Sequence, residues 1–214
     1  MEIVFIVVLI GLLGGAVISF IRMGLRQRRR TNALAREAHE MGLRFSAEDP
    51  FDMSRRYGGF DLMNTGHSLR ASNVTYGRQK GRLLRSFDFR CEVGHGTRRM
   101  TRAYRVVVAE TERSMPAAMM WNDRDVDAAP LGTRQGDVRI GCWLCRGSGA
   151  FGAVLAQACR PLAEDGLSMQ ALGTALMLCL PIQGGVAHGG GWLERISCLL
   201  DSLSETGELS GSSG

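Results

Sequence analysis

The sequence comprises 214 residues, of which 45% are hydrophobic and 22% charged, a composition that excludes general disorder and suits one ordinary domain. The formal net charge of +5 is no larger than the charge of a single arginine-rich stretch, so no nucleic-acid surface is needed to explain the basic balance. With 28 glycines and 5 prolines, the chain favours tight turns between strands over a bundle of long helices.

The first segment of the chain, from Ile3 to Ile21, is apolar and carries no charge. At about 1.5 Å per residue it is long enough to cross a hydrocarbon layer of roughly 30 Å. A cleaved signal peptide would have its basic stretch before the apolar core, whereas here the basic stretch follows it. We therefore predict a transmembrane anchor over residues 1–22, with a helix buried in a protein core as the alternative.

A block of arginines follows this segment, consisting of Arg22, Arg26, Arg28, Arg29 and Arg30. Because Lys and Arg beside a membrane segment are retained in the cytoplasm, the block predicts a single-pass protein with its N-terminus outside and its body in the cytoplasm. The same side chains can bind anionic lipid headgroups at the membrane surface, each contributing around 1 kcal/mol. Fixing the topology is by itself a sufficient role for them.

Small residues recur every four positions in the apolar segment, at Gly11, Gly15 and Ser19. At this spacing they share one face of a helix, and such a face lets two membrane helices approach closely. The stripe predicts a homodimer formed through this helix. The alternative is that glycine is simply common in membrane helices.

A basic juxtamembrane helix is predicted over residues 23–42, where Gly42 provides the C-terminal cap. A domain over residues 43–204 follows. Its first part alternates between apolar and polar residues around glycine turns, which is typical of an antiparallel meander. The predicted strands cover residues 69–76, 83–93, 100–110, 117–121 and 137–143.

The last third of the chain mixes helix and strand. Ser148 is the expected N-cap of a helix over residues 150–162, and an apolar run over 168–182 predicts a hairpin that turns near Gly173. A final amphipathic helix over residues 192–203 has a predicted buried stripe consisting of Leu193, Ile196, Leu200 and Leu203.

Together these elements predict an α+β fold, in which a transmembrane helix precedes an antiparallel β-rich domain with two packed helices. A partly closed barrel capped by the C-terminal helix is one way to arrange them. The polar tail over residues 205–214 is expected to be disordered.

The chain has six cysteines, which in the cytoplasm are expected to be reduced and mostly buried. Cys142 and Cys145 have the spacing of half a zinc site or of a redox pair. Cys91 and His95, at the end of a predicted hairpin, would complete a zinc site of three cysteines and one histidine. The alternative is that Cys91 points into the core, that His95 lies in a turn and that no cofactor binds.

His67 lies near hydroxyl and carboxylate side chains in the sequence, an arrangement that suggests acid–base chemistry. No nucleophile motif accompanies it, and polar residues that stabilise a turn explain the segment better. We therefore assign no catalytic residue and favour a non-enzymatic protein.

The segment Phe60–Gly77 (FDLMNTGHSLRASNVTYG) and the run Ser86–Arg90 that follows it resemble a group of bacterial proteins without an established function. Gly42–Phe45 and Asp49–Phe51 match two further stretches of that group. The resemblance extends over about residues 1–112 and implies the same layout, with one N-terminal membrane helix, arginines and then a meander. It implies a location at the bacterial cytoplasmic (inner) membrane, and no particular activity, substrate or cofactor.

The sequence thus predicts a membrane-anchored cytoplasmic interaction module. Its expected partners are the lipid bilayer, anionic lipid headgroups or another membrane-associated protein, and not nucleic acid. The alternative function is a zinc- or thiol-based site built on Cys142 and Cys145 with Cys91 and His95.

Overall fold

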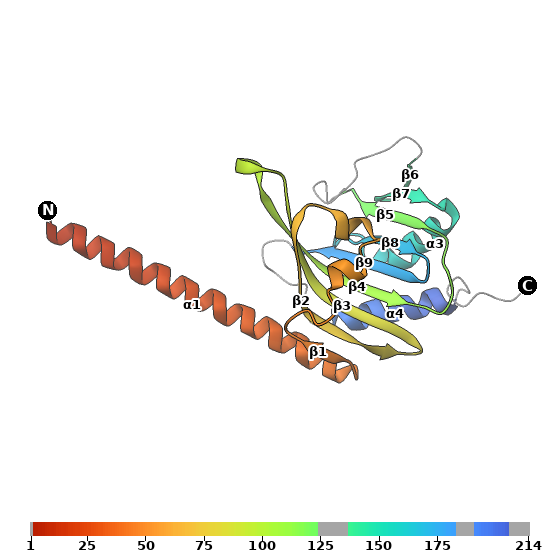
Figure 1. Cartoon of the computed structure of the whole chain (residues 1–214), viewed down its shortest axis with the longest axis horizontal. Coiled ribbons are helices and arrows are strands. Elements are labelled where there is room, and N and C mark those ends of the chain that lie inside the picture. Colours follow the sequence, from red (N-terminus) through yellow and green to blue (C-terminus); the bar gives the residue numbers. More distant parts are fainter. Residues whose placement is uncertain (1, 124–136, 183–190, 206–214) are drawn as a thin grey trace, which may run out of the picture.

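A computed structural model describes residues 2–123, 137–182 and 191–205, with side chains from residue 11 onward except at positions 26, 204 and 205. Within these residues a nine-stranded antiparallel sheet carries helices on both faces, and one long helix extends away from it (Figure 1). The predicted α+β class agrees with this architecture, while the predicted tail beyond residue 205 lies outside the described residues. The helices are α1 (Glu2–Glu40), α2 (Met53–Arg56), α3 (Gly149–Cys159) and α4 (Trp192–Glu205), with 3-10 turns η1 (Asp61–Asn64), η2 (Gly96–Arg98) and η3 (Arg160–Leu162).

The strands form one open sheet in the order β1-β2-β3-β4-β9-β8-β5-β7-β6, and each is antiparallel to its neighbours. The predicted partly closed barrel is wrong, because β1 and β6 are edge strands that do not pair with each other in the described part of the chain. The strands are β1 (Arg44–Ser46), β2 (His67–Gln79), β3 (Arg82–Val93), β4 (Met100–Glu110), β5 (Ala118–Asn122), β6 (Val138–Ile140), β7 (Trp143–Gly147), β8 (Ser168–Leu172) and β9 (Ala175–Pro181).

The sheet has a hydrophobic core on each of its faces. Because side chains alternate along a strand, β3 sends Leu84 to one core and Phe87 and Phe89 to the other. The Leu84 core includes residues of α3, α4 and the C-terminal end of α1. The Phe87 core includes residues of α2 and η1. Ser86 and Asp88, which alternate with these aromatic residues along β3, are also buried.

Two predicted helices and one predicted hairpin are found in the structure. The Ser148 hydroxyl accepts a hydrogen bond from the backbone N–H of Phe151 at 3.3 Å, so Ser148 is the N-cap of α3. The predicted hairpin over 168–182 is confirmed as β8 and β9, which turn at Gly173 with a φ of +59°. The predicted stripe on α4 is buried at all four positions, Leu193, Ile196, Leu200 and Leu203.

The strand predicted over residues 137–143 is in fact a hairpin. β6 ends at Ile140, β7 begins at Trp143, and the two pair across Gly141 and Cys142. Gly141 has a φ of +61°, a turn conformation that an apolar pattern does not reveal. Cys142 consequently lies in a turn, and Cys145 lies in the strand that follows.

The predicted transmembrane helix is wrong. Among the residues that the structure describes, no helix is both long enough and apolar enough to cross a bilayer. One continuous helix, α1, runs from Glu2 to Glu40 and includes both the predicted anchor and the predicted juxtamembrane helix.

Candidate functional site

The C-terminal end of α1 is fixed to the sheet by both apolar and polar contacts. Leu34 and Ala38 are buried, and Ala38 belongs to the core that α3 and α4 also cover. One turn before Leu34, the Thr31 hydroxyl donates a hydrogen bond to the side-chain oxygen of Asn73 on β2 at 3.2 Å. Residues from 30 onward therefore dock on the sheet, while the earlier part of the helix extends away from it (Figure 1).

A buried carboxylate lies at the centre of this contact. Asp88 on β3 is 3% exposed and accepts three side-chain hydrogen bonds. The donors are Arg30 Nη2 at 2.9 Å, Asn73 Nδ2 at 2.8 Å and Arg105 Nε at 2.6 Å. A buried charge is tolerated only when it is paired and hydrogen-bonded, and this arrangement satisfies both conditions. The Asp88 cluster, which is Arg30, Asn73, Asp88 and Arg105, thus joins α1 to three strands.

An irregularity in β2 aims Asn73 at this carboxylate. The pairing of β2 with β3 shifts register between Ser72 and Thr75, and Asn73 has a φ of +52° at that point. Such a bulge turns a side chain out of the regular alternation, and Asn tolerates the left-handed conformation better than most residues. The bulge therefore lets Asn73 contact both Asp88 and Thr31.

The cluster holds more positive than negative charge. Burial lowers the pKa of Arg30, the Asp88 carboxylate opposes that shift, and the positive charges of Arg105 and Arg90 lower the pKa further. The guanidinium group of Arg30 keeps its positive charge, as arginine does throughout proteins. One nitrogen of Arg30, Nε, is buried without a hydrogen-bond partner in the described part of the chain. Both oxygens of the Asp88 carboxylate therefore accept hydrogen bonds, whereas one buried donor of Arg30 lacks an acceptor among the described residues.

A second contact joins α1 to α4. The Glu37 carboxylate accepts a hydrogen bond from the backbone N–H of Leu193 at 3.0 Å, in the first turn of α4. The first N–H groups of a helix have no partner within the helix, and its N-terminus favours negative charge. Glu37 therefore caps α4 from a residue 156 positions earlier in the chain.

The projecting part of α1 carries large apolar side chains that are exposed to solvent. They are 49–72% exposed and consist of Leu12, Leu13, Val17, Ile18, Phe20, Ile21, Met23 and Leu25. Gly11, Gly15 and Ser19 lie in the same exposed stretch. No atom of the described residues lies within 4 Å of a Cβ placed at Gly11 or Gly15. A contiguous apolar surface of this kind marks an interaction site in most soluble proteins.

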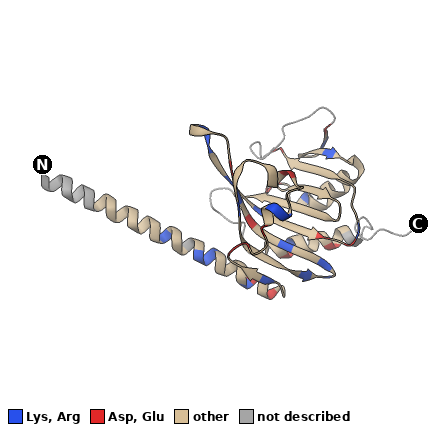
Figure 2. Cartoon of the chain, in the orientation of Figure 1, with Lys and Arg blue, Asp and Glu red and all other residues tan. Residues whose placement is uncertain are grey.

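The arginine block divides between the two parts of the helix. Arg22, Arg28 and Arg29 are exposed, and the side chain of Arg26 lies outside the described residues. Arg30, which the sequence grouped with them at a membrane surface, points at the sheet instead, with its side chain 15% exposed. Figure 2 shows the basic positions of α1 where the helix approaches the sheet.

The structure does not bring the four residues of the zinc hypothesis together. Cys91 is buried in the core beneath α2 and η1, whereas Cys145 is buried in the core beneath α3, on the opposite face of the sheet. Cys142 lies in a turn with its Sγ 3.6 Å from Asn122 Nδ2, and His95 lies in an exposed turn after β3. Among the residues that the structure describes, no group of three or more His, Cys, Asp or Glu could hold a metal ion.

The buried thiols are also held in their protonated form. Burial raises the pKa of Cys91, which the nearby Arg102 opposes, and burial together with Asp137 raises the pKa of Cys145. Metal binding and redox exchange both require the thiolate. The environment of these two cysteines therefore favours a structural role.

His67 lies beside another histidine and not beside a nucleophile. Its ring stacks on that of His95 with centroids 5.8 Å apart, and its Nε2 lies 3.8 Å from the Glu92 carboxylate. Glu92 is in turn paired with Arg99. This group closes the end of the β2, β3 and β4 strands, in agreement with the turn-stabilising interpretation of the segment.

Arg85, which interrupts the apolar side of β3 in the sequence, has buried polar partners. Its Nη1 donates to the Tyr57 hydroxyl at 2.7 Å and to the carboxylate of Glu110, and the Tyr57 hydroxyl donates to Glu110 at 2.7 Å. Burial and the hydrogen bond to Glu110 raise the pKa of Tyr57 to about 12. Sequence reasoning missed this network, although an arginine in an apolar strand face was a signal for it.

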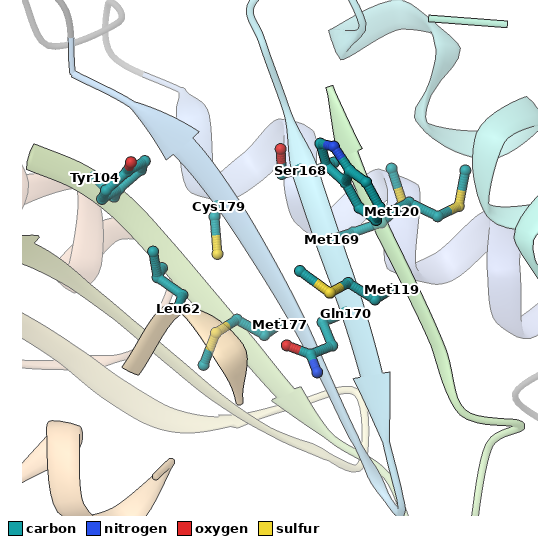
Figure 3. Close-up of a pocket in the computed structure, with 10 residues that line it drawn as sticks. Leu62, Tyr104, Met119, Met120, Ser168, Met169, Gln170, Met177 and Cys179 are labelled. Atoms are coloured by element: carbon teal, nitrogen blue, oxygen red, sulfur yellow. The ribbon is translucent and has the colours of Figure 1, made fainter. Parts of the chain in front are cut away.

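A small pocket opens on the face of the sheet opposite α3 and α4. Figure 3 shows side chains from η1, β4, β5, β8 and β9 around it, among them Leu62, Tyr104, Met119, Met177 and Cys179. Its volume of about 40 Å³ is close to the space of a single water molecule and far below the roughly 300 Å³ at which small-molecule sites begin. The pocket is therefore not our candidate site, which is α1 and its junction with the sheet.

The fold defines the class of this protein as an open antiparallel sheet with a helical layer and a projecting N-terminal helix. The chain matches no protein-family profile and no curated protein. Among solved structures it is similar to the crystal structure of the mycobacterial trehalose monomycolate transport factor A, TtfA. The two chains are 13% identical with a TM-score of 0.53, and the likeness covers 84% of this chain and 94% of the other. At that identity the comparison shows a shared fold.

Proposed function

We propose that this protein is a non-enzymatic interaction module that associates with a membrane through the projecting part of α1. The observation that carries the proposal is the row of exposed apolar side chains from Leu12 to Leu25, on a helix whose other end is fixed to a folded domain. Burying one such side chain contributes about 1.5–3 kcal/mol, so leaving the row in water is costly. An apolar partner is therefore required.

The distribution of these side chains favours lipid over a protein groove. At 100° per residue, the large apolar residues occupy roughly two thirds of the circumference of the helix. A helix that binds a protein groove or core usually presents a stripe only a little wider than about 100°. A lipid surface can take up such a wide apolar face, whereas a protein groove covers one side of the helix.

The arginines supply the charge complementarity for such an association. Arg22, Arg28 and Arg29 are exposed and come directly after the apolar row. Each basic residue near an anionic lipid surface contributes about 1 kcal/mol. In this proposal the headgroups of the cytoplasmic leaflet lie beside these arginines, and the sheet domain lies on the cytoplasmic side.

The structural neighbour supports a non-enzymatic role for the sheet domain. TtfA is, by its name, a factor in the transport of trehalose monomycolate. By analogy at the level of the fold, we propose that the sheet domain of this chain binds a protein partner at the membrane. We also propose that Gly11, Gly15 and Ser19, which occupy the remaining third of the helix surface, bring two copies together there.

Vesicle flotation tests the proposed membrane association. The full chain should float with vesicles of phosphatidylcholine and phosphatidylglycerol, and the variant Leu13→Gln/Phe20→Gln should partition at least about 100-fold more weakly. The matched control Val138→Gln/Leu172→Gln changes two exposed apolar residues of the sheet domain. Failure of the wild-type chain to float, or equal loss in the control, would overturn the proposal.

A further inference from the structure

Two arginines lie directly opposite each other on neighbouring strands. Arg70 of β2 pairs in register with Arg90 of β3, and both side chains are exposed. Residues in this relation have Cβ atoms about 4.5–5.5 Å apart, and like charges there destabilise a sheet. The pair is therefore unfavourable unless something negative lies between the two guanidinium groups.

No carboxylate of the described chain serves that purpose. Asp88, two residues before Arg90 and on the same face of β3, is already occupied by the three donors of its cluster. Glu92, two residues after Arg90, pairs with Arg99. Among the described residues, neither the Arg70 side chain nor the Arg90 side chain makes a hydrogen bond or an ion pair. The positive charge at this place is uncompensated.

The pair lies next to the point where α1 leaves the sheet. Arg90 is close enough to Arg30 for its charge to lower the pKa of Arg30, and the buried Nε of Arg30 has no partner in the described structure. Arg22 lies eight residues before Arg30, about 80° away around the helix and about 12 Å along its axis. Basic groups of α1 and of the sheet thus converge on one location.

We propose that Arg70 and Arg90, together with Arg30, form a binding site for a phosphate group at the junction of α1 and the sheet. A guanidinium presents a planar fork of donors that matches phosphate oxygens, and two forks facing each other can bind one phosphate from both sides. The inference deepens the proposed membrane association, because an anionic phospholipid headgroup beside α1 supplies such a group. A soluble phosphate ester offers the same chemistry, so the experiment separates the two sources.

The test compares Arg70→Gln/Arg90→Gln with the matched control Arg44→Gln/Arg160→Gln, which also removes two exposed arginines from the sheet domain. The probes are phosphatidylglycerol-containing vesicles, phosphatidylcholine vesicles and soluble glycerol 3-phosphate. We expect the Arg70/Arg90 variant to bind the anionic vesicles on the order of 10- to 30-fold more weakly than the control. Without any ligand, its melting temperature should equal or exceed that of the wild type, because the like-charge repulsion is removed.

The outcomes are distinct. Loss confined to anionic vesicles assigns the site to a lipid headgroup, and a rise in melting temperature with glycerol 3-phosphate that only the Arg70/Arg90 variant lacks assigns it to a soluble ester. Equal behaviour of the two double variants with both probes overturns the site. If the wild type ignores vesicles but responds to glycerol 3-phosphate through Arg70 and Arg90, the site stands and the membrane proposal fails.

Discussion

Arg30 of α1 donates a 2.9 Å hydrogen bond to the buried carboxylate of Asp88, which lies 58 residues later on β3. This contact joins the segment that was predicted as a juxtamembrane helix to a buried strand of the sheet domain. Because Asp88 also binds Asn73 and Arg105, loss of its charge affects α1, β2 and β4 together.

Replacement of Asp88 by asparagine should destabilise the protein strongly. Arg30 and Arg105 would remain largely buried without a counter-charge, and breaking a buried ion pair costs about 3–5 kcal/mol. Chemical denaturation measures the change in the free energy of unfolding. In the control Asp123→Asn, the carboxylate lost is paired with exposed Arg139, so the change should stay below about 1 kcal/mol. Similar effects for the two variants would contradict the role of Asp88.

Replacement of Glu37 by glutamine should loosen the start of α4. The charged cap on the Leu193 N–H contributes about 0.3–1 kcal/mol, because the N-terminus of a helix favours negative charge. Hydrogen exchange should show faster opening of the first turn of α4 and little change in the central strands. Glu40→Gln, a substitution of an exposed residue one turn later on α1, serves as the control and should leave α4 unchanged.

The stability of the protein should fall at high pH through Tyr57. Its pKa of about 12 in the folded state exceeds the ordinary value of 10, so the neutral phenol favours folding. This contribution is fully present below pH 10 and is lost as the pH rises from about 10 to about 12. Denaturation as a function of pH should show a loss of at most about 2 kcal/mol over that interval, allowing for partial solvent screening.

Tyr57→Phe should abolish that high-pH loss, and Tyr76→Phe should retain it. The Tyr76 ring packs edge-on against Phe51, so its replacement by phenylalanine preserves an apolar contact as a control. An unchanged pH dependence in Tyr57→Phe would show that another group is responsible.

The cysteines should differ widely in reactivity towards a thiol reagent. Cys198 is exposed on α4, whereas Cys159 is fully buried and burial raises its pKa to about 12. We expect Cys198 to be labelled rapidly and Cys159 only when the protein unfolds, since the thiolate is the reactive form. Mass spectrometry of the labelled peptides gives the order of reaction, and early labelling of Cys159 would contradict the packing beneath α3.

Self-association through α1 should depend on the small-residue stripe. Gly15→Leu adds a large side chain to the stripe, and Gly14→Leu adds the same side chain next to it. Among the residues that the structure describes, nothing lies within 4 Å of a Cβ at either position, so neither variant should disturb the fold. Crosslinking in lipid vesicles should show fewer dimers for Gly15→Leu than for Gly14→Leu. Equal dimer yields would remove the stripe from the proposal.

Local patterns in the sequence predicted much of the sheet domain. The strand over residues 100–110 matches β4 at both ends, and the alternation in 83–93 predicts β3 to within one residue. The stripe of α4 followed from helical spacing alone. These features depend on neighbours in the chain, which is why periodicity and turn residues were sufficient.

Contacts between distant segments could not be predicted in the same way. The polar side of β3 reads as solvent-facing, yet Asp88 is buried because α1 covers it, and no local pattern records that docking. The same limitation affected the N-terminal helix, where hydropathy gave no indication that Arg30 points at a sheet.

Because α1 is docked at Arg30, the projecting part of the helix extends from the sheet domain in a fixed direction. Residues 11–29 continue the docked helix without a break and span roughly 28 Å at 1.5 Å per residue. A flexible linker would let the domain tumble, whereas this geometry fixes the direction of the sheet relative to whatever holds the far end. A partner that binds the sheet domain would therefore find it at a fixed distance from the far end of α1 and in a fixed orientation.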